Sequence, residues 1–497
     1  MKNTRKRMLA LLLCALLLTS GILSGCAGEA EPAGDTTAQS DTTAGEDAAT
    51  EETELTDGLE DVDMDGFEMR FLHAQADQIN WVEVTLDAGA DSGDILNQAI
   101  FLRNEYIRDR FNCELTFAEM PHVDIDSKYY KQYVMSGDDA HDIIMLNNTH
   151  VLNHVTDVAD LNHIPHVRFD EEWWNPQGSS LFYMDGKRLA VAGNYSLASV
   201  STANCLLFNK GIYTDLGIAE SLYDVVREGK WTIDKYFSVA AQAQNDLNGD
   251  GTMDAKDRYG TTGTVKSLHN MFIVGAGLSW VGQDKDGFPV FEPSTDEKFV
   301  SYVEKIVNTE IADPTIYYMP TNGIHSEEYP IRFEEGQALF FTCWPKNFFK
   351  IREMEYEFGV VPAPKYDEEQ SKYYANMANG EFTTLPRTYR EDRLENMGIL
   401  LEAMSFYTQQ NVIPVYTDKV LDLKVTRDYE SAEMLDLVFA GVTYDFGVNG
   451  WAADVSDKLI EKIFYAKSTA IVSELVAIEP VIQSNIEKLR VSVKEVP

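Results

Sequence analysis

The chain has 497 residues, of which 44% are hydrophobic and 25% are charged, and its formal net charge is −40 at pH 7. This length allows two or three domains or one large two-lobed unit. Nucleic acids and anionic lipid surfaces are bound through basic patches, so the strongly acidic charge excludes both as main partners.

The N-terminus has the pattern of an export signal. Residues 2–7 are rich in Lys and Arg, and residues 8–18 form an unbroken apolar run. This run is shorter than the roughly 20 apolar residues that span a bilayer. Leu23-Ser24-Gly25-Cys26 resembles the bacterial lipobox, whose Cys is acylated and becomes the first residue of the mature protein. We therefore predict a signal peptide over 1–25 and a lipid anchor at Cys26 that holds the exported protein at the outer face of the cell membrane.

An acidic segment follows the anchor. Between residues 27 and 65 the chain contains many Asp and Glu residues, no Lys or Arg, and otherwise mostly Ala, Thr and Gly. Such a segment has too little apolar surface to offset its chain entropy, and its charges repel one another. We predict that residues 26–65 are a disordered tether.

The remaining chain alternates between strand and helix patterns. Apolar or alternating runs at 67–72, 113–117 and 141–146 predict strands, and residues 96–111 carry one apolar helical face. The alternation resumes after Tyr195. Strand–helix–strand units in this order predict an α/β fold with a mainly parallel sheet. The widely spaced Cys113, Cys205 and Cys343 predict buried free thiols rather than a disulfide framework.

One loop has the ligand spacing of a calcium site. Residues 246–257 read DLNGDGTMDAKD, with oxygen-bearing residues at loop positions 1, 3, 5, 9 and 12 and Gly at position 6. This is the arrangement of an EF-hand loop, although position 12 is Asp rather than the longer Glu. An ordinary acidic turn is the alternative. The pattern predicts a structural Ca²⁺ held by Asp246, Asn248, Asp250, Thr252, Asp254 and Asp257.

Two segments in the second half of the chain resemble a known family. Residues 333–340 read FEEGQALF, Trp344-Pro345 follow, and 358–367 read FGVVPAPKYD. Their order and spacing resemble the family 1 extracellular solute-binding proteins of ABC importers, which share F-x-x-G-x-A and G-V-x-P-x-P segments. HDIIML at 141–146 and LLFNKGIYTDLGI at 206–218 are similar to two further segments, although the family usually has Pro where His141 stands.

The resemblance implies a fold of two α/β lobes joined by a hinge, with the ligand in the cleft between the lobes. The implied first lobe comprises 66–195 plus 385–430, and the second comprises 200–375 plus 431–497. The implied crossing segments between the lobes are 193–196 and 379–381. Closure of the lobes over a ligand follows from such an architecture.

Aromatic and amide side chains suit a carbohydrate, whose CH faces stack on rings and whose hydroxyls need polar partners. Trp344 matches a cleft position in sugar-binding relatives. The other candidates follow the strand at 141–146 or lie near the implied crossings and cleft loops, where core packing is an equal expectation for each; they are Asn147, Asn148, Tyr195, His269, Phe272 and Glu381. Trp173-Trp174-Asn175-Pro176 could line the cleft or pack inside a loop.

The sequence thus predicts a monomeric binding protein, not an enzyme, that captures a small polar solute, expected to be an oligosaccharide, and delivers it to an ABC permease. A peptide ligand remains an alternative, as does a surface-anchored glycan-processing enzyme. Motifs of common hydrolases and nucleotide-binding sites are absent from the sequence. His150 and His154 could form a zinc pair on one helical face, but no third ligand with suitable spacing accompanies them.

Overall fold

The computed structural model describes residues 56–75, 86–89, 94–317, 328–351, 354–377, 380–421 and 429–497. The predicted signal peptide, Cys26 and most of the predicted tether lie outside these residues, as does Asn379 of the second implied crossing. Among the described residues, no helix combines the length and the apolar character needed to span a membrane.

The first lobe is built on a five-stranded sheet with the order β2-β1-β3-β15-β4. β1 is parallel to β2 and β3, whereas β15 runs antiparallel to β3 and β4. β3 is buried along its whole length, as expected for a central strand with a continuous apolar run. The strands are β1 (Phe67–Ala74), β2 (Cys113–Met120), β3 (Ile143–Asn147), β4 (Val158–Ala159) and β15 (Glu381–Pro386).

The second lobe is built on another five-stranded sheet, with the order β11-β8-β12-β7-β13. β8 is parallel to β11 and β12, and β7 runs antiparallel to both β12 and β13. The strands are β7 (Cys205–Asn209), β8 (Tyr259–Thr262), β11 (Ile316–Tyr317), β12 (Ala338–Cys343) and β13 (Phe358–Val361).

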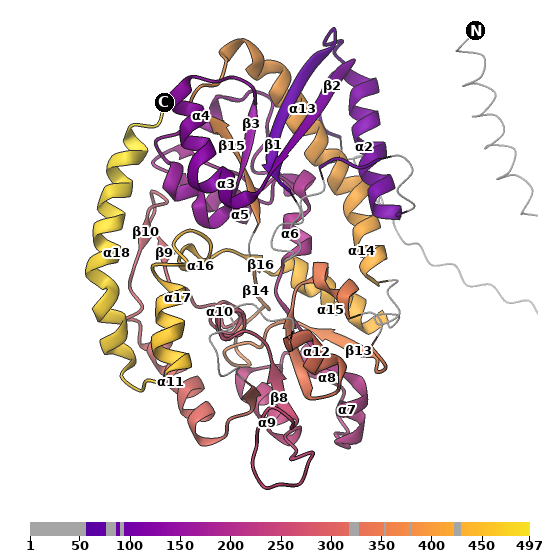
Figure 1. The fold of residues 1–497 in the computed structure, drawn as a ribbon, viewed down its shortest axis with the longest axis vertical. Helices are drawn as coiled ribbons and strands as arrows, with labels where there is room; N and C mark the ends of the chain where they lie inside the picture. The colour runs from indigo at the N-terminus through magenta and orange to yellow at the C-terminus, as the bar shows by residue number, and fades with distance from the viewer. Residues whose placement is uncertain are drawn as a thin grey trace, which may run out of the picture. The chain divides into compact units, whose positions relative to one another are not determined.

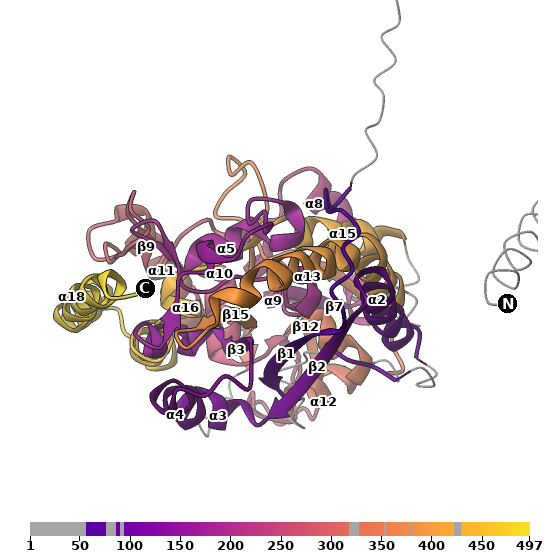
Figure 2. The same cartoon turned by 90° about the horizontal axis from the view of Figure 1, so that it is seen from above.

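Helices cover both sheets (Figures 1 and 2). In the first lobe α2 packs on β2 and on α13, and in the second α9 packs on β8 and α12 on β12. The helices are α2 (Ile95–Phe111), α3 (His122–Asp124), α4 (Tyr130–Ser136), α5 (Pro176–Leu181), α6 (Ala198–Ser201), α7 (Lys210–Asp215), α8 (Leu222–Arg227), α9 (Ile233–Gln242), α10 (Val265–Gly275), α11 (Glu297–Ala312), α12 (Glu328–Glu334), α13 (Leu394–Tyr407), α14 (Ile413–Leu421), α15 (Tyr429–Ala440), α16 (Phe446–Asn449), α17 (Ser456–Leu459) and α18 (Ile471–Lys494).

Three small sheets complete the described part of the chain. The pairs are β5 (Tyr183–Met184) with β6 (Lys187–Arg188), β9 (Gly282–Gln283) with β10 (Pro289–Val290), and β14 (Ala375–Asn376) with β16 (Val442–Thr443). Cys113, Cys205 and Cys343 are buried free thiols, as predicted.

The lobes are connected by segments that run between their sheets. Residues 191–204 lead from the first sheet to β7 through η5 (Asn194–Ser196) and α6, and residues 376–381 lead from β14 to β15. Figure 1 shows α6 and β14 between the strands of the two sheets. A third connection is the helical run from α13 through η8 (Thr408–Val412) to α14, which packs against η6 (Pro345–Lys350) of the second lobe.

Arg103 of α2 binds two of these connections. Its guanidinium donates to the Tyr195 carbonyl oxygen at 2.9 Å and to the Thr408 hydroxyl at 3.3 Å. It also donates to the Leu86 carbonyl oxygen at 2.6 Å. The side chain is fully buried, and burial lowers its pKa to about 10, so it remains charged at neutral pH. One buried cation therefore holds the first and third connections together.

The folded part begins earlier than the predicted tether boundary at residue 65. Arg110 of α2 forms ion pairs with Asp57 and with Asp61, the latter at 2.7 Å. Met64 is buried, and its backbone N–H donates to the Phe111 carbonyl oxygen at 2.8 Å. The last acidic residues of this segment are thus ordered because they find a basic partner on α2.

The C-terminal helix contacts both lobes. α18 packs against α11 of the second lobe. Beyond it, the carbonyl oxygen of Pro497 accepts a hydrogen bond from the Asp160 backbone N–H at 3.1 Å, and Lys187 donates to the carbonyl oxygen of Val496. The second-lobe assignment of residues 431–497 therefore describes only part of their packing.

The Trp173–Trp174 pair packs in the interior of the first lobe. The Trp173 indole N–H donates to the Glu402 carboxylate at 3.0 Å and that of Trp174 at 2.7 Å. Arg168 donates to the same carboxylate from its backbone N–H at 3.1 Å and from Nε at 2.8 Å. Of the two alternatives for this motif, the structure favours packing inside the fold.

Candidate functional site

The carboxyl edge of the first sheet meets the second connection. β3 ends at Asn147, and Asn147 pairs with Glu381, the first residue of β15. The next residue, Asn148, donates its backbone N–H to the Gly380 carbonyl oxygen at 2.9 Å and accepts the Gly380 N–H on Oδ1 at 3.3 Å. Three of the predicted ligand-binding residues, Asn147, Asn148 and Glu381, therefore lie together where the chain enters the first sheet.

The corresponding edge of the second sheet brings three polar side chains into one row. Cys343 of β12 pairs with Cys205 of β7, so Trp344 follows β12 beside Asn204, which precedes β7. The backbone N–H of Asn204 in turn donates to the Asn376 carbonyl oxygen at 2.8 Å. We call Trp344, Asn204 and Asn376 the junction row.

Some of the buried polar atoms without a hydrogen-bond partner lie at these two edges. Within the described part of the chain, the indole Nε1 of Trp344 and the Oδ1 atoms of Asn204 and Asn376 are buried without a hydrogen bond, as is Oε2 of Glu381. Each such group costs about 1–3 kcal/mol unless something supplies a partner. Asn376 and Glu381 are five residue steps apart in the chain, so their Cα atoms lie at most about 18 Å apart. A small solute could therefore reach both edges and supply the missing partners.

Carboxyl groups dominate the electrostatics of the first-lobe edge. Burial raises the pKa of Glu381 well above its usual range, and the nearby charges of Asp126 and Glu119 raise it further. Burial also raises the pKa of Asp126 to about 7. The environment of Glu381 therefore favours its protonated form, and Asp126, with a pKa of about 7, is close to half-protonated at neutral pH.

The other predicted ligand-binding residues lie in the core. The Tyr195 hydroxyl pairs with the Thr383 hydroxyl, and the ring is fully buried against the first sheet. His269 lies inside the second lobe, where Nδ1 is 2.8 Å from the Val265 carbonyl oxygen and Nε2 is 2.9 Å from Glu310 Oε1. Phe272, one turn further along α10, is also fully buried. Packing accounts for the positions of all three rings.

The predicted calcium loop is closed by its own hydrogen bonds. Asp246 accepts the backbone N–H groups of Gly249 and Gly251, both at 2.7 Å. The fully buried Asp257 accepts those of Leu247 at 2.9 Å and Asp254 at 2.7 Å. Across the described residues, no three His, Cys, Asp or Glu side chains converge as metal ligands. As placed, these residues do not form a calcium cage, and the calcium site stays a prediction from the sequence.

The histidines near residue 150 serve the fold. Nδ1 of His154 lies 3.1 Å from the Asp157 carboxylate, and Nε2 lies 2.7 Å from the Asp126 carbonyl oxygen. Because protein oxygens engage both ring nitrogens, His154 has none left for zinc. His150 Nε2 is 3.9 Å from the Asp126 carboxylate, and burial lowers the pKa of His150 below 6.5.

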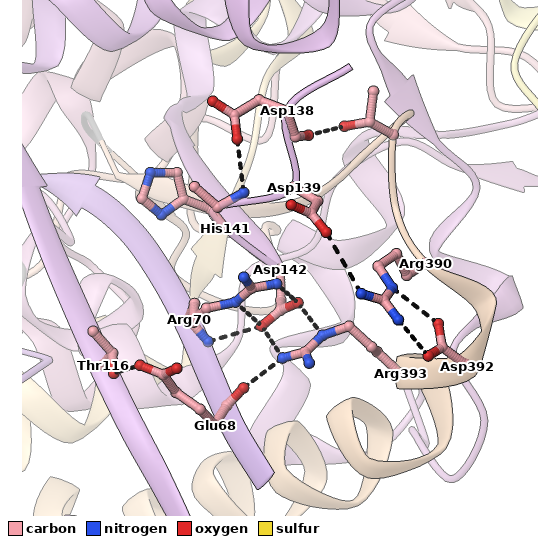
Figure 3. Close-up of polar contacts among 12 residues, drawn as sticks. Glu68, Arg70, Thr116, Asp138, Asp139, His141, Asp142, Arg390, Asp392 and Arg393 are labelled. Atoms are coloured by element: carbon pink, nitrogen blue, oxygen red, sulfur yellow. Dashed lines mark hydrogen bonds and ion pairs between the residues drawn. The ribbon is translucent and has the colours of Figure 1, made fainter. Parts of the chain in front are cut away.

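A charged cluster at the opposite end of β3 contrasts with the candidate site. Figure 3 shows Asp142 between the guanidinium groups of Arg70 and Arg393, which donate to it at 2.6–3.1 Å. Burial disfavours the Asp142 carboxylate, but the hydrogen bonds from Arg70 and Arg393 outweigh it and lower its pKa. This cluster is internally satisfied, whereas the carboxyl edge of the same sheet is not.

The sequence analysis missed Asn204 and Asn376. Each is a polar residue next to a buried strand position, Asn204 directly before the apolar run that begins at Cys205. A polar residue directly before a buried apolar run indicates where a segment that connects the lobes ends and a strand begins. The pairing of Asn204 with Trp344 on one side and Asn376 on the other depends on strand register, which a single sequence does not reveal.

No protein-family profile matches the sequence, and no curated protein matches it. Solved structures do share the fold. One is the galacto-N-biose/lacto-N-biose I-binding protein of the ABC transporter from Bifidobacterium longum in complex with lacto-N-biose, at a TM-score of 0.56 and 12% identity over 86% of this chain and 98% of that one. Another is an ABC substrate-binding protein from Listeria monocytogenes in complex with cycloalternan, at a TM-score of 0.53 and 17% identity over 85% and 98%.

A third solved structure with the same fold is a Mycobacterium tuberculosis protein in complex with glycerophosphocholine. Its TM-score is 0.53, with 12% identity over 78% of this chain and 95% of that one. At these identities the likeness concerns the fold alone. The predicted two-lobed α/β fold of periplasmic binding proteins is confirmed.

Proposed function

We propose that this chain is the extracellular solute-binding component of an ABC importer and that it captures an oligosaccharide between its lobes. The observation that carries the proposal is the junction row of Trp344, Asn204 and Asn376, whose buried polar atoms lack partners within the described residues. An indole beside unsatisfied amide groups is suited to a sugar, because the ring can stack on a CH face while the amides bind hydroxyls.

In the proposed mechanism, binding and closure are one event. The solute enters while the lobes are apart, and contacts with both edges then favour the closed state. Closure requires only that the closed state bind the solute more tightly than the open state does. The three connections absorb the change in backbone angles, as hinges do in two-lobed binding proteins. The closed form then docks on a membrane permease.

The location of the protein is part of the proposal. A signal peptide over residues 1–25 would direct export, and acylated Cys26 would hold the folded part at the outer face of the membrane. The strongly acidic net charge of −40 is compatible with a soluble surface protein that does not bind nucleic acid. We propose that the protein acts as a monomer.

The test is thermal unfolding across a panel of mono- and oligosaccharides, with peptides and glycerophosphodiesters as further solutes. A ligand at about 100 times its dissociation constant adds roughly 2.7 kcal/mol of stability. We expect one saccharide class to raise Tm and to be recovered unchanged. Trp344→Ala should lower its affinity at least tenfold, whereas the control Tyr429→Ala, at an 84% exposed aromatic, should not.

Other outcomes would replace the proposal. A Tm shift with peptides alone would assign a peptide-binding protein, and conversion of the recovered saccharide would assign a glycan-processing enzyme. Cooperative unfolding with no shift for any solute would refute binding of these solute classes.

A further inference from the structure

The buried carboxyl group of Glu381 is half-satisfied. Its Oε1 accepts the Ala74 backbone N–H at 2.9 Å, while Oε2 has no partner among the described residues. The residue is only 2% exposed and stands where the second connection enters the first sheet. A buried carboxylate without a counter-charge has a high free energy, because burial removes its hydration. Such a group is stabilised either by a proton or by a bound cation.

Two further carboxyl groups lie at the same edge. Asp126 is on η1 (Ile125–Tyr129), which packs against β3, and its Oδ2 is likewise buried without a partner in the described structure. Glu119 ends β2 one strand beyond β1. Within the described part of the chain, no Lys or Arg forms an ion pair with Glu381, Asp126 or Glu119.

The remaining titratable groups facing this edge do not neutralise it. His73 of β1 lies 3.9 Å from Glu119, and its Nε2 is buried without a partner in the described structure. Burial lowers the pKa of His73 below 6.5, as it does for His150 of η2 (Asn148–His154), so both imidazoles are neutral at pH 7. Tyr195 of η5 is an uncharged phenol whose hydroxyl is taken by Thr383. His154, whose Nδ1 lies 3.1 Å from the Asp157 carboxylate, opposes the raised pKa of Asp126 but does not outweigh burial. The edge therefore combines acidic groups with unpaired polar atoms, and no Lys or Arg in the described part of the chain is paired with those acidic groups.

We propose that Glu381 and Asp126 form a subsite for a cationic amino group of the bound solute, so that the saccharide is an amino sugar. This inference rests on the proposed solute-binding function and narrows its substrate class. An ammonium group carries up to three N–H donors and a positive charge, which match two carboxyl oxygens that lack donors. A neutral hydroxyl supplies a donor but no positive charge, so it does not favour the ionised form of either carboxyl group.

Proton balance distinguishes the two kinds of ligand. Burial without a paired cation favours the protonated form of Glu381, so an incoming ammonium group that ionises this carboxyl group releases a proton to the buffer. No covalent bond changes. Affinity for an amino sugar should therefore rise as pH increases from 5.0 to 6.5, a range in which the amine remains charged. A neutral sugar requires no such release. Movement of the lobes about their connections gives the solute access to the edge.

The experiment compares saccharides that differ at one position. Gluco- and galacto-oligosaccharides with a free amino, an N-acetylamino or a hydroxyl group at carbon 2 are titrated into the mature chain by calorimetry at pH 5.0 and 6.5. We expect one amino form to bind at least tenfold more tightly than its two partners. Its binding heat should also vary with the ionisation enthalpy of the buffer, which reports proton release.

Two variants test the residues. Glu381→Gln and Asp126→Asn should each reduce the affinity for the amino form at least tenfold and diminish proton release. Glu114→Gln, which changes an exposed carboxylate on β2, should do neither. If Glu381→Gln does not unfold cooperatively, Asp126→Asn and the proton release of the unaltered chain still decide the question.

The possible outcomes distinguish a failure of the cationic subsite from a failure of the proposed solute-binding function. If a hydroxyl or N-acetyl form binds as tightly as its amino form, without proton release, the cationic subsite is refuted while the solute-binding function stands. If no saccharide of any kind binds, both the proposed carbohydrate-binding function and the cationic subsite are refuted.

Discussion

The strongest stability prediction concerns Glu402, a fully buried carboxylate on α13. Replacing it with Ala leaves the indole N–H groups of Trp173 and Trp174 buried without an acceptor. Each unsatisfied donor costs about 1–3 kcal/mol, which gives about 4 kcal/mol for the pair. Arg168 adds little, because its side chain is 39% exposed and can turn to water. The free energy of unfolding should therefore fall by about 4 kcal/mol.

Equilibrium urea unfolding monitored by tryptophan fluorescence measures this change, and two of the reporting indoles are those that lose their acceptor. Glu395→Ala is the matched control on the same helix. Its side chain is 66% exposed and pairs with His166 at 2.6 Å, so its loss should cost less than about 1 kcal/mol. A loss below about 1 kcal/mol for Glu402→Ala would refute the reasoning, because it would mean that the indoles find other acceptors.

Three further predictions concern the candidate site, the connections and the predicted calcium loop. Burial raises the pKa of Asp126 to about 7, so its contribution to stability is present below pH 4 and lost as pH rises through 7. Asp126→Asn should then stabilise the protein by up to about 4 kcal/mol at pH 8 but little at pH 4, as Tm against pH will show, while the exposed Asp124→Asn should have no such pH-dependent effect. Arg103→Lys should cost about 2–4 kcal/mol in urea unfolding, because an ammonium group cannot reach all the acceptors that the guanidinium binds. If residues 246–257 bind calcium, a chelator will lower the Tm of the unaltered chain and leave that of Asp246→Ala unchanged, because position 1 of such a loop requires Asp; equal responses would refute the site.

The fold was predictable because its evidence is local. Alternating and continuous apolar runs mark β1, β2 and β3, because burial and strand period are properties that a single sequence displays directly. The two lobes were implied by the resemblance of FEEGQALF, Trp344 and FGVVPAPKYD to the family 1 solute-binding proteins. The apolar run at 141–146 also predicted that Asn147 and Asn148 follow a strand, whereas Glu381 was expected at a crossing between the lobes from the family resemblance.

The features that the sequence did not predict depend on contacts between residues that are distant in the sequence. Trp174 is buried because Glu402, 228 positions away, accepts its indole N–H. His269, a candidate cleft residue, lies in the core because its Nε2 contacts Glu310, 41 positions away. The end of the tether was likewise misplaced because Arg110 holds Asp57 across 53 positions. Composition predicts that an acidic segment repels itself, but it does not predict that a distant cation will bind it.

The position of β15 has a consequence for the order in which the protein can fold. β15 lies between β3 and β4, and Thr384 of β15 bonds to Ile144 of β3 across 240 positions of chain. β4 has no other strand partner in the described sheet. While the chain is being synthesised from its N-terminus, β3 therefore keeps an apolar edge unpaired until Pro386 has emerged. The first lobe cannot complete its sheet as an independent unit, so folding is nearly a whole-chain event and its incomplete forms expose a strand edge to aggregation.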